Sequence, residues 1–350
     1  MKKTLRGNSF HSVKGGVGKS TLATHLALRL AREPGKRPTF LIDMDLTGTS
    51  LADVLPLRAP TWSDIATDGN KSSLLRTRPR GFLSRAETLR DMDWRDEVAH
   101  MGADAKAAGL SGASYLPFLN DYLLFSPKDW RDAEADVDPH SLLWGLDLPD
   151  APDNLYVLPS SALPSDLEKI LPVVFDEHYA GFLENRFELL LDALLLHFGD
   201  ISVVVDTPPT IPGLSRAVLN LALRLGSPGQ QKQALVQGGR LPAAIEEAEL
   251  TWNAQLVTTP DIQDVRAAAR WYSLTSPAER EVIGFLFNRV RSGRREEVRA
   301  HLESLFEAGH MLFAVPWQFH HYDPAVQIFD AEHRVAACEG VKFPGWLDEE

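Results

Sequence analysis

The chain has 350 residues, which is enough for one large α/β domain or two modest ones and for a sizeable core. Its formal net charge of −12 excludes a surface that is basic all over, so any affinity for nucleic acid would need a local patch. Cys338 is the only cysteine, which excludes a disulfide framework and a cysteine-cluster metal site within one chain, and which fits a reducing compartment.

The first predicted unit combines a strand at 9–13, a glycine-rich turn and a helix at 20–32. The turn reads Ser12-Val13-Lys14-Gly15-Gly16-Val17-Gly18-Lys19-Ser20-Thr21. Its glycines allow a tight turn whose N–H groups point inward, and the start of the following helix adds free N–H groups and a partial positive charge. This order of elements predicts a phosphate-binding loop, in which Lys19 reaches the β- and γ-phosphates and the Ser20 hydroxyl ligates Mg²⁺. The alternative is a glycine-rich turn that binds no ligand.

The second predicted strand is a short apolar run at 39–45 that ends in Asp43 and Asp45. A run without polar alternation is typical of a central parallel strand that is buried on both faces. Ligands of open α/β sheets lie beyond the carboxyl ends of the strands, so both carboxylates are expected beside the phosphates. A pair of helix-capping acids before Leu46 is the alternative.

Residues 59–153 interrupt the regular alternation of strand and helix. The stretch is rich in Arg, Asp and Trp, with a helix predicted at 83–108 and a strongly apolar run at 115–125. Structureless loops of this length are rare, so we interpret it as an insertion, mostly helical and irregular, on the ligand side of the sheet. Its aromatic residues either bind a protein partner or form a satellite core; they include Trp62, Trp94, Trp130 and Trp144.

The regular pattern resumes with a predicted strand at 154–160, helical residues from about 164, and a leucine-periodic helix at 179–198 that is expected to cover one face of the sheet. An apolar, β-branched strand at 201–205 follows, and it ends in Asp206, Thr207, Pro208 and Pro209. This is the Walker B arrangement, in which Asp206 lies beside Mg²⁺, through a water molecule or through Ser20. A terminal turn aspartate is the alternative.

The remaining elements complete the predicted sheet. Helices are expected at 213–225 and 242–252, separated by a polar break at 226–232, and a second nucleotide-sensing switch is expected near 208–214. A strand at 254–261 leads to a helix at 262–272 that exposes Arg266 and Arg270, and further strands are predicted at 282–290 and 311–316. Together these elements predict an α/β fold: a doubly wound, mostly parallel sheet flanked by helices, forming a single domain over 1–350 with the insertion at 59–153.

The loop pattern K-G-G-V-G-K-S resembles the deviant Walker A motif of the ParA/MinD family of P-loop ATPases, within the SIMIBI class. It carries Lys14 ahead of the glycine pair, while Val13 stands where the common P-loop motif has its first glycine. The D-x-D pair of the second strand, the D-T-P-P segment that begins at Asp206 and the Asn288-Arg289 pair follow in the order of the family. This combination is more specific than any one of its motifs.

The resemblance implies a role for each of these residues. Lys14 would reach the nucleotide of the facing subunit in an ATP-bound dimer, Asp43 would lie on the magnesium side, and Asp45 would orient or activate the attacking water. The Asn288 amide would read adenine, with a turn-forming asparagine as the alternative. The nucleotide-binding residues implied are Gly15, Gly16, Val17, Gly18, Lys19, Ser20, Thr21, Asn288, Arg289 and Pro316, with Trp317 a weaker candidate; those implied for magnesium are Ser20, Asp43 and Asp206, and those implied for catalysis are Lys14, Lys19 and Asp45.

The resemblance also implies Mg²⁺-dependent hydrolysis of ATP to ADP and phosphate by a homodimer that forms on ATP binding, as a molecular switch in DNA partition or intracellular positioning. The single cysteine argues against the metal-carrying branches, and the acidic, Pro-Gly-broken residues 343–350 argue against a membrane-positioning branch. Non-specific DNA is therefore a candidate partner, with a solvated basic face as the alternative. The densest basic run contains Arg289, Arg291, Arg294, Arg295 and Arg299.

Two other functions remain open. Segment 7–16 also resembles the start of ParA-like ATPases attached to bacterial signalling or conflict (defence) modules, and such an ATP-gated regulator of an effector would hold a protein partner through 59–153. A non-enzymatic scaffold that uses ATP as a structural element is the third reading. The N-terminal residues show no apolar core of a signal peptide, and no run approaches the ~18 apolar residues of a spanning helix, so we expect a cytoplasmic protein with no integral membrane segment.

Overall fold

A computed structural model describes residues 2–46, 51–55, 57–58, 118–124, 139–146, 151–160, 171–209, 213–226, 242–290, 296–297, 300–301, 303–304 and 317–321. Several sequence predictions lie outside these residues. They are the helix at 83–108, the helical residues from about 164 to 170, the strand at 311–316 with Pro316, and the basic residues Arg291, Arg294, Arg295 and Arg299.

The described part of the chain contains a seven-stranded sheet with the order β5-β2-β6-β1-β7-β8-β9. Every neighbouring pair in it is parallel, which confirms the predicted doubly wound α/β fold. The strands are β1 (Thr4–Ser12), β2 (Thr39–Asp43), β5 (Leu155–Leu158), β6 (Ile201–Pro209), β7 (Glu249–Thr258), β8 (Ile283–Val290) and β9 (Trp317–His321).

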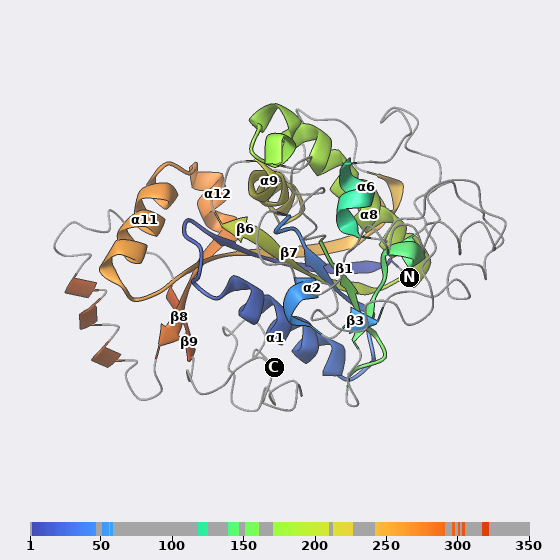
Figure 1. Ribbon diagram of the computed structural model, residues 1–350, viewed down its shortest axis with the longest axis horizontal. Helices are drawn as coiled ribbons and strands as arrows, with labels where there is room; N and C mark the ends of the chain where they lie inside the picture. Colours follow the sequence, from blue (N-terminus) through green and yellow to red (C-terminus); the bar gives the residue numbers. More distant parts are fainter. Residues whose placement is uncertain are drawn as a thin grey trace, which may run out of the picture.

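Helices cover both faces of this sheet (Figure 1). On one face lies α1 (Lys19–Arg32), the long blue helix, and on the other lie α8 (Ala180–Phe198), α9 (Leu214–Gly226) and the shorter α10 (Ala243–Glu247). At the β8 end of the sheet, α11 (Ile262–Ser273) and α12 (Pro277–Val282) lie on the same face as α8 and α9. None of the helices that the structure describes combines the length and apolar character needed to cross a bilayer.

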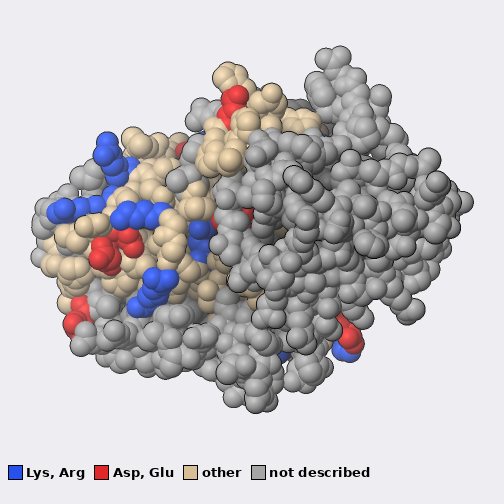
Figure 2. Space-filling view, in the orientation of Figure 1, with Lys and Arg blue, Asp and Glu red and all other residues tan. Residues whose placement is uncertain are grey.

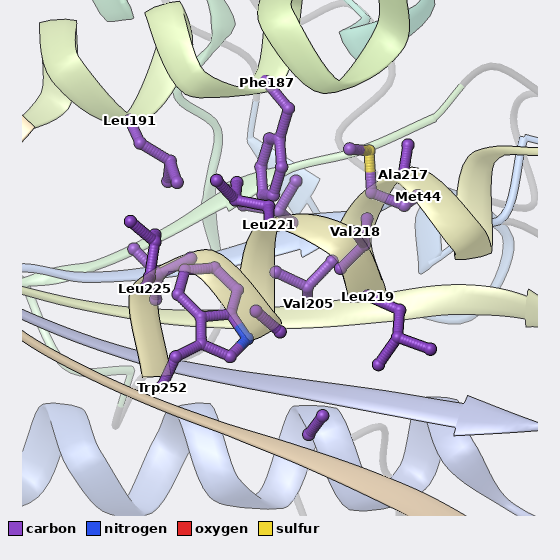
Figure 3. Packing of buried hydrophobic residues seen from close by; sticks show 14 of the residues in the cluster. Met44, Phe187, Leu191, Val205, Ala217, Val218, Leu219, Leu221, Leu225 and Trp252 are labelled. Atoms are coloured by element: carbon purple, nitrogen blue, oxygen red, sulfur yellow. The ribbon is translucent and has the colours of Figure 1, made fainter. Parts of the chain in front are cut away.

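The central strands are buried on both faces, and their apolar runs accordingly do not alternate with polar residues. Leu41, Val204 and Val257 pack in the cluster under α1, whereas their neighbours Phe40, Val205 and Leu256 belong to the cluster under α8 and α9. Figure 3 shows how Phe187 of α8 and Val218 of α9 fill the space above β6 and β7. The two layers are the reason for near-continuous hydrophobicity in a parallel sheet.

The described parts of the predicted insertion pack into the core. They comprise α6 (Leu119–Leu124), a 3-10 turn at Pro139–Leu142 and β4 (Gly145–Leu146). Just before the insertion lie α2 (Leu51–Val54) and β3 (Leu57–Arg58), and β3 pairs with β4 in antiparallel orientation. Phe118 stacks on Trp144 with ring centroids 5.2 Å apart, and both are buried. Both rings belong to the main cluster under α1 rather than to a separate satellite core, and neither is available to a partner.

Helix α6 is tied to α8 by a reciprocal contact. The Tyr122 hydroxyl donates to the Arg186 carbonyl (2.9 Å), and the Arg186 guanidinium donates to the Tyr122 carbonyl (2.6 Å). The guanidinium carbon also lies 4.2 Å from the centre of the Tyr122 ring. Because these groups are buried and bonded in both directions, this part of the 59–153 stretch is fixed to the sheet layer.

The predicted helix at 242–252 is wrong at its C-terminal end. Helix α10 ends at Glu247, and residues from Glu249 onward form β7, whose first residues pair with Thr4 and Leu5 of β1. The reason is long-range: Trp252 lies opposite Gly7, packs over β1 and donates its indole N–H to Ser9 Oγ (3.2 Å). Pairing of this kind cannot be read from local propensity.

Substituting Gly7 with Ala is expected to lower the free energy of unfolding by about 1–3 kcal/mol, because the new methyl group would overlap the Trp252 ring. Gly181→Ala is the matched control, since Gly181 is exposed in α8 with nothing within 4 Å of the added carbon. That substitution is expected to stabilise by about 0.5–1 kcal/mol. Urea unfolding measures both, and equal effects of the two substitutions would contradict the packing of Trp252 over β1.

Candidate functional site

The carboxyl ends of the parallel strands bring the predicted site residues to one edge of the sheet. The loop after β1, the acids after β2, the end of β6 and the end of β8 all meet there. From β1 the chain crosses to β2 on the α1 side, while β6 leads to β7 through α9 on the opposite side. This reversal of direction beside β1 is the place where open α/β sheets bind ligands.

The glycine-rich loop has the backbone conformation that its sequence predicts. Gly16 and Gly18 have φ angles of 76° and 92°, a left-handed region that other residues avoid. Helix α1 starts directly at Lys19, with Gly18 as its N-cap, no side-chain cap and no acidic residue in its first turn. Gly15 and Gly16 are exposed. The helix therefore presents its partial positive end to the loop without a side chain to neutralise it.

Asn288, at the end of β8, lies against this loop. Its amide nitrogen donates to the Val17 carbonyl (2.8 Å), and the side chain is almost completely buried. A Cβ atom on Gly18 would overlap the same amide, so Gly18 is required by this close approach as well as by its φ angle. The residue predicted to read the base is thus also a contact of the phosphate loop.

Lys19 and Asp206 are buried and charged, and the partly buried Ser20 bonds to Asp206. Burial lowers the pKa of Lys19, while the carboxylates of Asp206 and Asp45 act in the opposite direction. Burial also raises the pKa of Asp206 to about 7, against the opposing effects of Lys19 and of a hydrogen bond with Ser20. The negative charges of Asp43 and Asp45 raise it further. Burying an acid among acids is unfavourable, and perturbed pKa values of this kind are typical of functional sites.

The residues of this cluster fit a magnesium ion that is shared with phosphate. One carboxylate oxygen of Asp206, Oδ1, is buried and has no hydrogen-bond partner among the described residues. Ser20 adds a hydroxyl oxygen, and hard oxygen donors suit Mg²⁺. No group of three potential metal-ligating side chains occurs in the described ranges, so the other ligands would be phosphate oxygens and water.

The D-x-D residues are placed at the same edge but make different contacts. Asp43 is buried, and its Oδ2 accepts hydrogen bonds from the Leu51 N–H (2.8 Å) and the Ser160 hydroxyl (2.8 Å). Its Oδ1 accepts from the Asp45 N–H at 3.1 Å. Asp43 therefore organises the segment that follows β2, whereas Asp45 is only partly buried and lies close enough to Lys19 and Asp206 to affect them electrostatically.

Lys14 contacts an acidic residue that is distant in the sequence. Its Nζ forms an ion pair with Asp264 Oδ1 (2.9 Å) in the first turn of α11. Asp264 Oδ2 in turn accepts a hydrogen bond from the Thr259 hydroxyl (2.6 Å). Arg289, the neighbour of Asn288, is exposed and contributes to the electrostatic surroundings of Asp264.

A buried polar network behind the loop was not predicted from the sequence. The Trp252 indole donates to Ser9 Oγ, which contacts His11 Nε2 (2.8 Å), and His11 Nδ1 contacts Ser215 Oγ (3.1 Å). Ser215 donates to Thr207 Oγ1 (3.2 Å), and Thr207 donates to the Phe10 carbonyl. These directions agree if His11 carries its hydrogen on Nδ1. Burial, then the charge of Lys19, lowers the pKa of His11 to about 3, so the ring is neutral.

Four residues missed by the sequence analysis thus support the site. Ser160 holds Asp43, Asp264 holds Lys14, and His11 with Ser215 fixes β1 to α9, the helix that follows the Asp206 strand. The sequence offered one weak signal for Asp264, an acid in the first turn of a helix after a strand that ends at the ligand edge. It offered none for the other pairings.

Comparison with known proteins agrees with this geometry. Residues 9–323 match the CobQ/CobB/MinD/ParA nucleotide binding domain (CbiA). Similar solved structures include a ParA family ATPase from Chlorobium tepidum, with 15% identity over 93% of this chain and 87% of that chain and a TM-score of 0.43. MinD of Pyrococcus horikoshii with Mg-ADP has 17% identity over 92% and 84%, with a TM-score of 0.42.

A third structure is cobyrinic acid a,c-diamide synthase of Mycobacterium smegmatis with ADP and magnesium, with 14% identity over 89% of this chain and 84% of that chain and a TM-score of 0.42. These structural likenesses are low, and the family assignment does not depend on them. The domain match spans most of the chain and includes the loop, the D-x-D pair, Asp206 and Asn288. The chain therefore belongs to the CobQ/CobB/MinD/ParA family of nucleotide-binding domains.

Proposed function

We propose that this protein is an Mg²⁺-dependent ATPase of the ParA/MinD type, which hydrolyses ATP to ADP and phosphate and forms a homodimer on ATP binding. The observation that carries the proposal is the buried pair of Lys19 and Asp206, with Ser20 beside it, at an uncapped glycine loop. A structural βα turn has no need of a buried lysine beside two carboxylates, whereas phosphoryl transfer needs positioned positive charge and a metal-binding acid. The proposed domain covers 1–350, with 59–153 as an insertion.

Each residue at the edge has a task in this proposal. The N–H groups of the loop from Gly15 to Thr21 and the Lys19 ammonium hold the β- and γ-phosphates, and Ser20 and Asp206 hold the magnesium ion. The ion, when bound, neutralises charge on the phosphate oxygens. Asp45 orients the attacking water, with Asp43 fixing its backbone. The base lies at Asn288 and Arg289, and at Pro316 beyond the described residues.

Asn288 would connect the base to the phosphate loop. A carboxamide has two N–H donors and a carbonyl oxygen, and one N–H is directed to the Val17 carbonyl. The base contact is therefore coupled to the position of the phosphate loop. An adenine in this place would be held by the same side chain that supports Gly18.

The decisive experiment measures ATP hydrolysis and the sedimentation of the full chain with a non-hydrolysable ATP analogue, each with and without random duplex DNA. We expect hydrolysis in the presence of Mg²⁺ and a monomer–dimer shift with the analogue but not with ADP. Lys14→Ala is expected to bind nucleotide as a monomer and to lose the shift. Nucleotide binding with neither turnover nor dimerisation would favour the scaffold reading instead.

DNA partition is the cellular role that we propose. On the side of the molecule where α11 lies, Lys and Arg side chains are interspersed with Asp and Glu (Figures 1 and 2). On α11, Arg266 and Arg270 are exposed. ATP-dependent, salt-sensitive binding of duplex DNA that is lost in Arg266→Ala/Arg270→Ala or Arg294→Ala/Arg295→Ala would support this role. Absence of DNA binding, together with a protein partner held by 59–153, would support the regulator of a signalling or defence effector.

The affinity for Mg²⁺-nucleotide is expected to rise about tenfold between pH 6 and pH 8, because the metal needs an ionised Asp206 and its pKa is raised to about 7. The effect of pH on folding stability has the opposite sign. Since the native state keeps a proton that the unfolded chain has lost, this group makes the ligand-free protein less stable as the pH rises from about 4 to 7. Fluorescence titration of a labelled ADP measures the affinity.

Asp206→Asn is the control for this pH dependence. The variant lacks the titrating carboxyl, while protonation of the nucleotide phosphates is the same for both proteins. We expect weaker Mg²⁺-dependent binding and a flatter pH profile in the variant. Identical profiles would show that Asp206 does not titrate in this range.

A further inference from the structure

The contact of Lys14 with Asp264 joins the loop after β1 to the start of α11. The two residues are 250 positions apart in the chain, and Lys14 Nζ lies 2.9 Å from Asp264 Oδ1. The Lys14 side chain is 42% exposed and that of Asp264 is 19% exposed. The ammonium group is therefore held at the surface on its own subunit, beside the exposed Gly15 and Gly16.

Asp264 is itself fixed in place. Its second oxygen accepts from the Thr259 hydroxyl (2.6 Å), and its position in the first turn of α11 gives it the favourable end of the helix dipole. Burial raises the pKa of Asp264, but the hydrogen bonds from Thr259 and Lys14 outweigh burial and leave this pKa below its usual value. The carboxylate is thus a charged, preformed acceptor for the lysine.

One lysine ammonium group cannot form ion pairs with two distant anions at the same time. Its ammonium is a compact charge on a flexible stem, so Lys14 can leave Asp264 without movement of the loop backbone. We propose that Asp264 is a positioning residue that holds Lys14 on its own subunit, so that formation of the ATP-bound dimer has to break the Lys14–Asp264 ion pair in both subunits. The inference rests on the proposed ATP-dependent dimer. It adds that the ion pair raises the dissociation constant of this dimer, an effect that we call the assembly threshold.

The size of this threshold follows from the exposure of the pair. Ion pairs that are partly open to water change an equilibrium by up to about fivefold. Two such pairs break for each dimer, so their loss is expected to change the dimer dissociation constant by about tenfold. The pair would therefore shift the concentration at which the dimer forms without preventing its formation.

The test is Asp264→Asn in the full chain with a non-hydrolysable ATP analogue. The dissociation constant of the dimer, measured by analytical ultracentrifugation, is expected to fall about tenfold, while the affinity of the monomer for ADP is unchanged. Asp261→Asn is the matched control. It removes the same charge from the same end of α11 and retains an N-cap of equal quality, and the Asp261 side chain accepts from the Gln263 N–H rather than from Lys14. An unchanged constant for Asp261→Asn and a lowered one for Asp264→Asn support the inference.

A double mutant separates this role from a structural one. In a Lys14→Ala background, which is expected to stay monomeric, Asp264→Asn is expected to leave the protein monomeric, since the residue acts through Lys14. Dimerisation that Asp264→Asn restores without Lys14 would overturn the inference. Asp264→Glu keeps the carboxylate and is expected to restore part of the wild-type threshold.

A measurement on the nucleotide-free monomer distinguishes the failure of this inference from failure of the proposed function. The rate of acetylation of Lys14 by an amine-reactive ester, read by peptide mass spectrometry against the other lysines, is expected to rise in Asp264→Asn. Equal rates, or wild-type and Asp264→Asn dimers of equal stability, would overturn the inference and leave the ATPase proposal standing. A wild-type protein that stays monomeric with the ATP analogue would overturn both.

Discussion

Asp45→Asn is expected to slow ATP turnover by at least about 100-fold while ATP-driven dimerisation persists, because a carboxylate that orients or deprotonates the attacking water contributes about 100- to 10,000-fold. The backbone of Asp45 is held independently of its side chain. Its N–H donates to Asp43 Oδ1 and its carbonyl accepts from the Ser160 hydroxyl (3.2 Å). Asparagine should therefore occupy the same place without the charge. Phosphate release measures the rate, and sedimentation with ATP measures the dimer.

Ser160→Ala provides a graded comparison for Asp45→Asn. It removes the hydroxyl that bonds to Asp43 Oδ2 and to the Asp45 carbonyl but leaves both carboxylates. We expect a smaller reduction in turnover, because the acids remain and only their placement loosens. Near-normal turnover by Asp45→Asn would assign the water to a different group.

Lys19→Ala is expected to weaken Mg²⁺-nucleotide binding by at least about 30-fold, since removing one partner of a buried, hydrogen-bonded charge pair costs about 2–5 kcal/mol. Lys19 is buried, so its ammonium is poorly hydrated and is available to a phosphate. Without it, Asp206 loses its nearest described source of opposing positive charge, and its pKa is expected to rise further above 7. Isothermal titration with ADP and Mg²⁺ measures the loss.

Arg32→Ala is the matched control for Lys19→Ala. Arg32 lies in the last turn of the same helix, is exposed, and carries the same charge at the end away from the loop. We expect nearly wild-type affinity from that variant. Binding by Lys19→Ala within threefold of wild type, in protein shown to be folded by circular dichroism, would exclude Lys19 from the phosphate site.

The elements of the sheet could be predicted because their signals are local. Apolar runs at 39–43, 201–205 and 283–287 have strand composition along their whole length, and the glycine loop carries its conformation in its own residues. The placement of Asp43, Asp206 and Asn288 at one edge then follows from the parallel topology. The extent of β7 could not be predicted, because Glu249–Trp252 become strand through pairing with β1.

The partners of the site residues were beyond prediction for the same physical reason. Asp43 and Ser160 are 117 positions apart, and Lys14 and Asp264 are 250 apart. A single sequence contains no local signal for a hydrogen bond between two such residues. The acceptor bonds of Asp43 to Leu51 and Ser160 are likewise created only in the folded chain.

The hydrogen-bonded chain from Trp252 through His11 to Thr207 has no formal charge, since the imidazole stays neutral at any physiological pH. Salt therefore has little charge to screen in this network, and the hydrogen bonds between β1 and α9 should not depend on the salt concentration. The half-exposed ammonium of Lys14 is in the opposite situation. Raising the ionic strength is therefore expected to weaken the Lys14–Asp264 ion pair and to leave the neutral network unchanged. The salt concentration can then change the dimerisation of the protein without lowering the stability of its core.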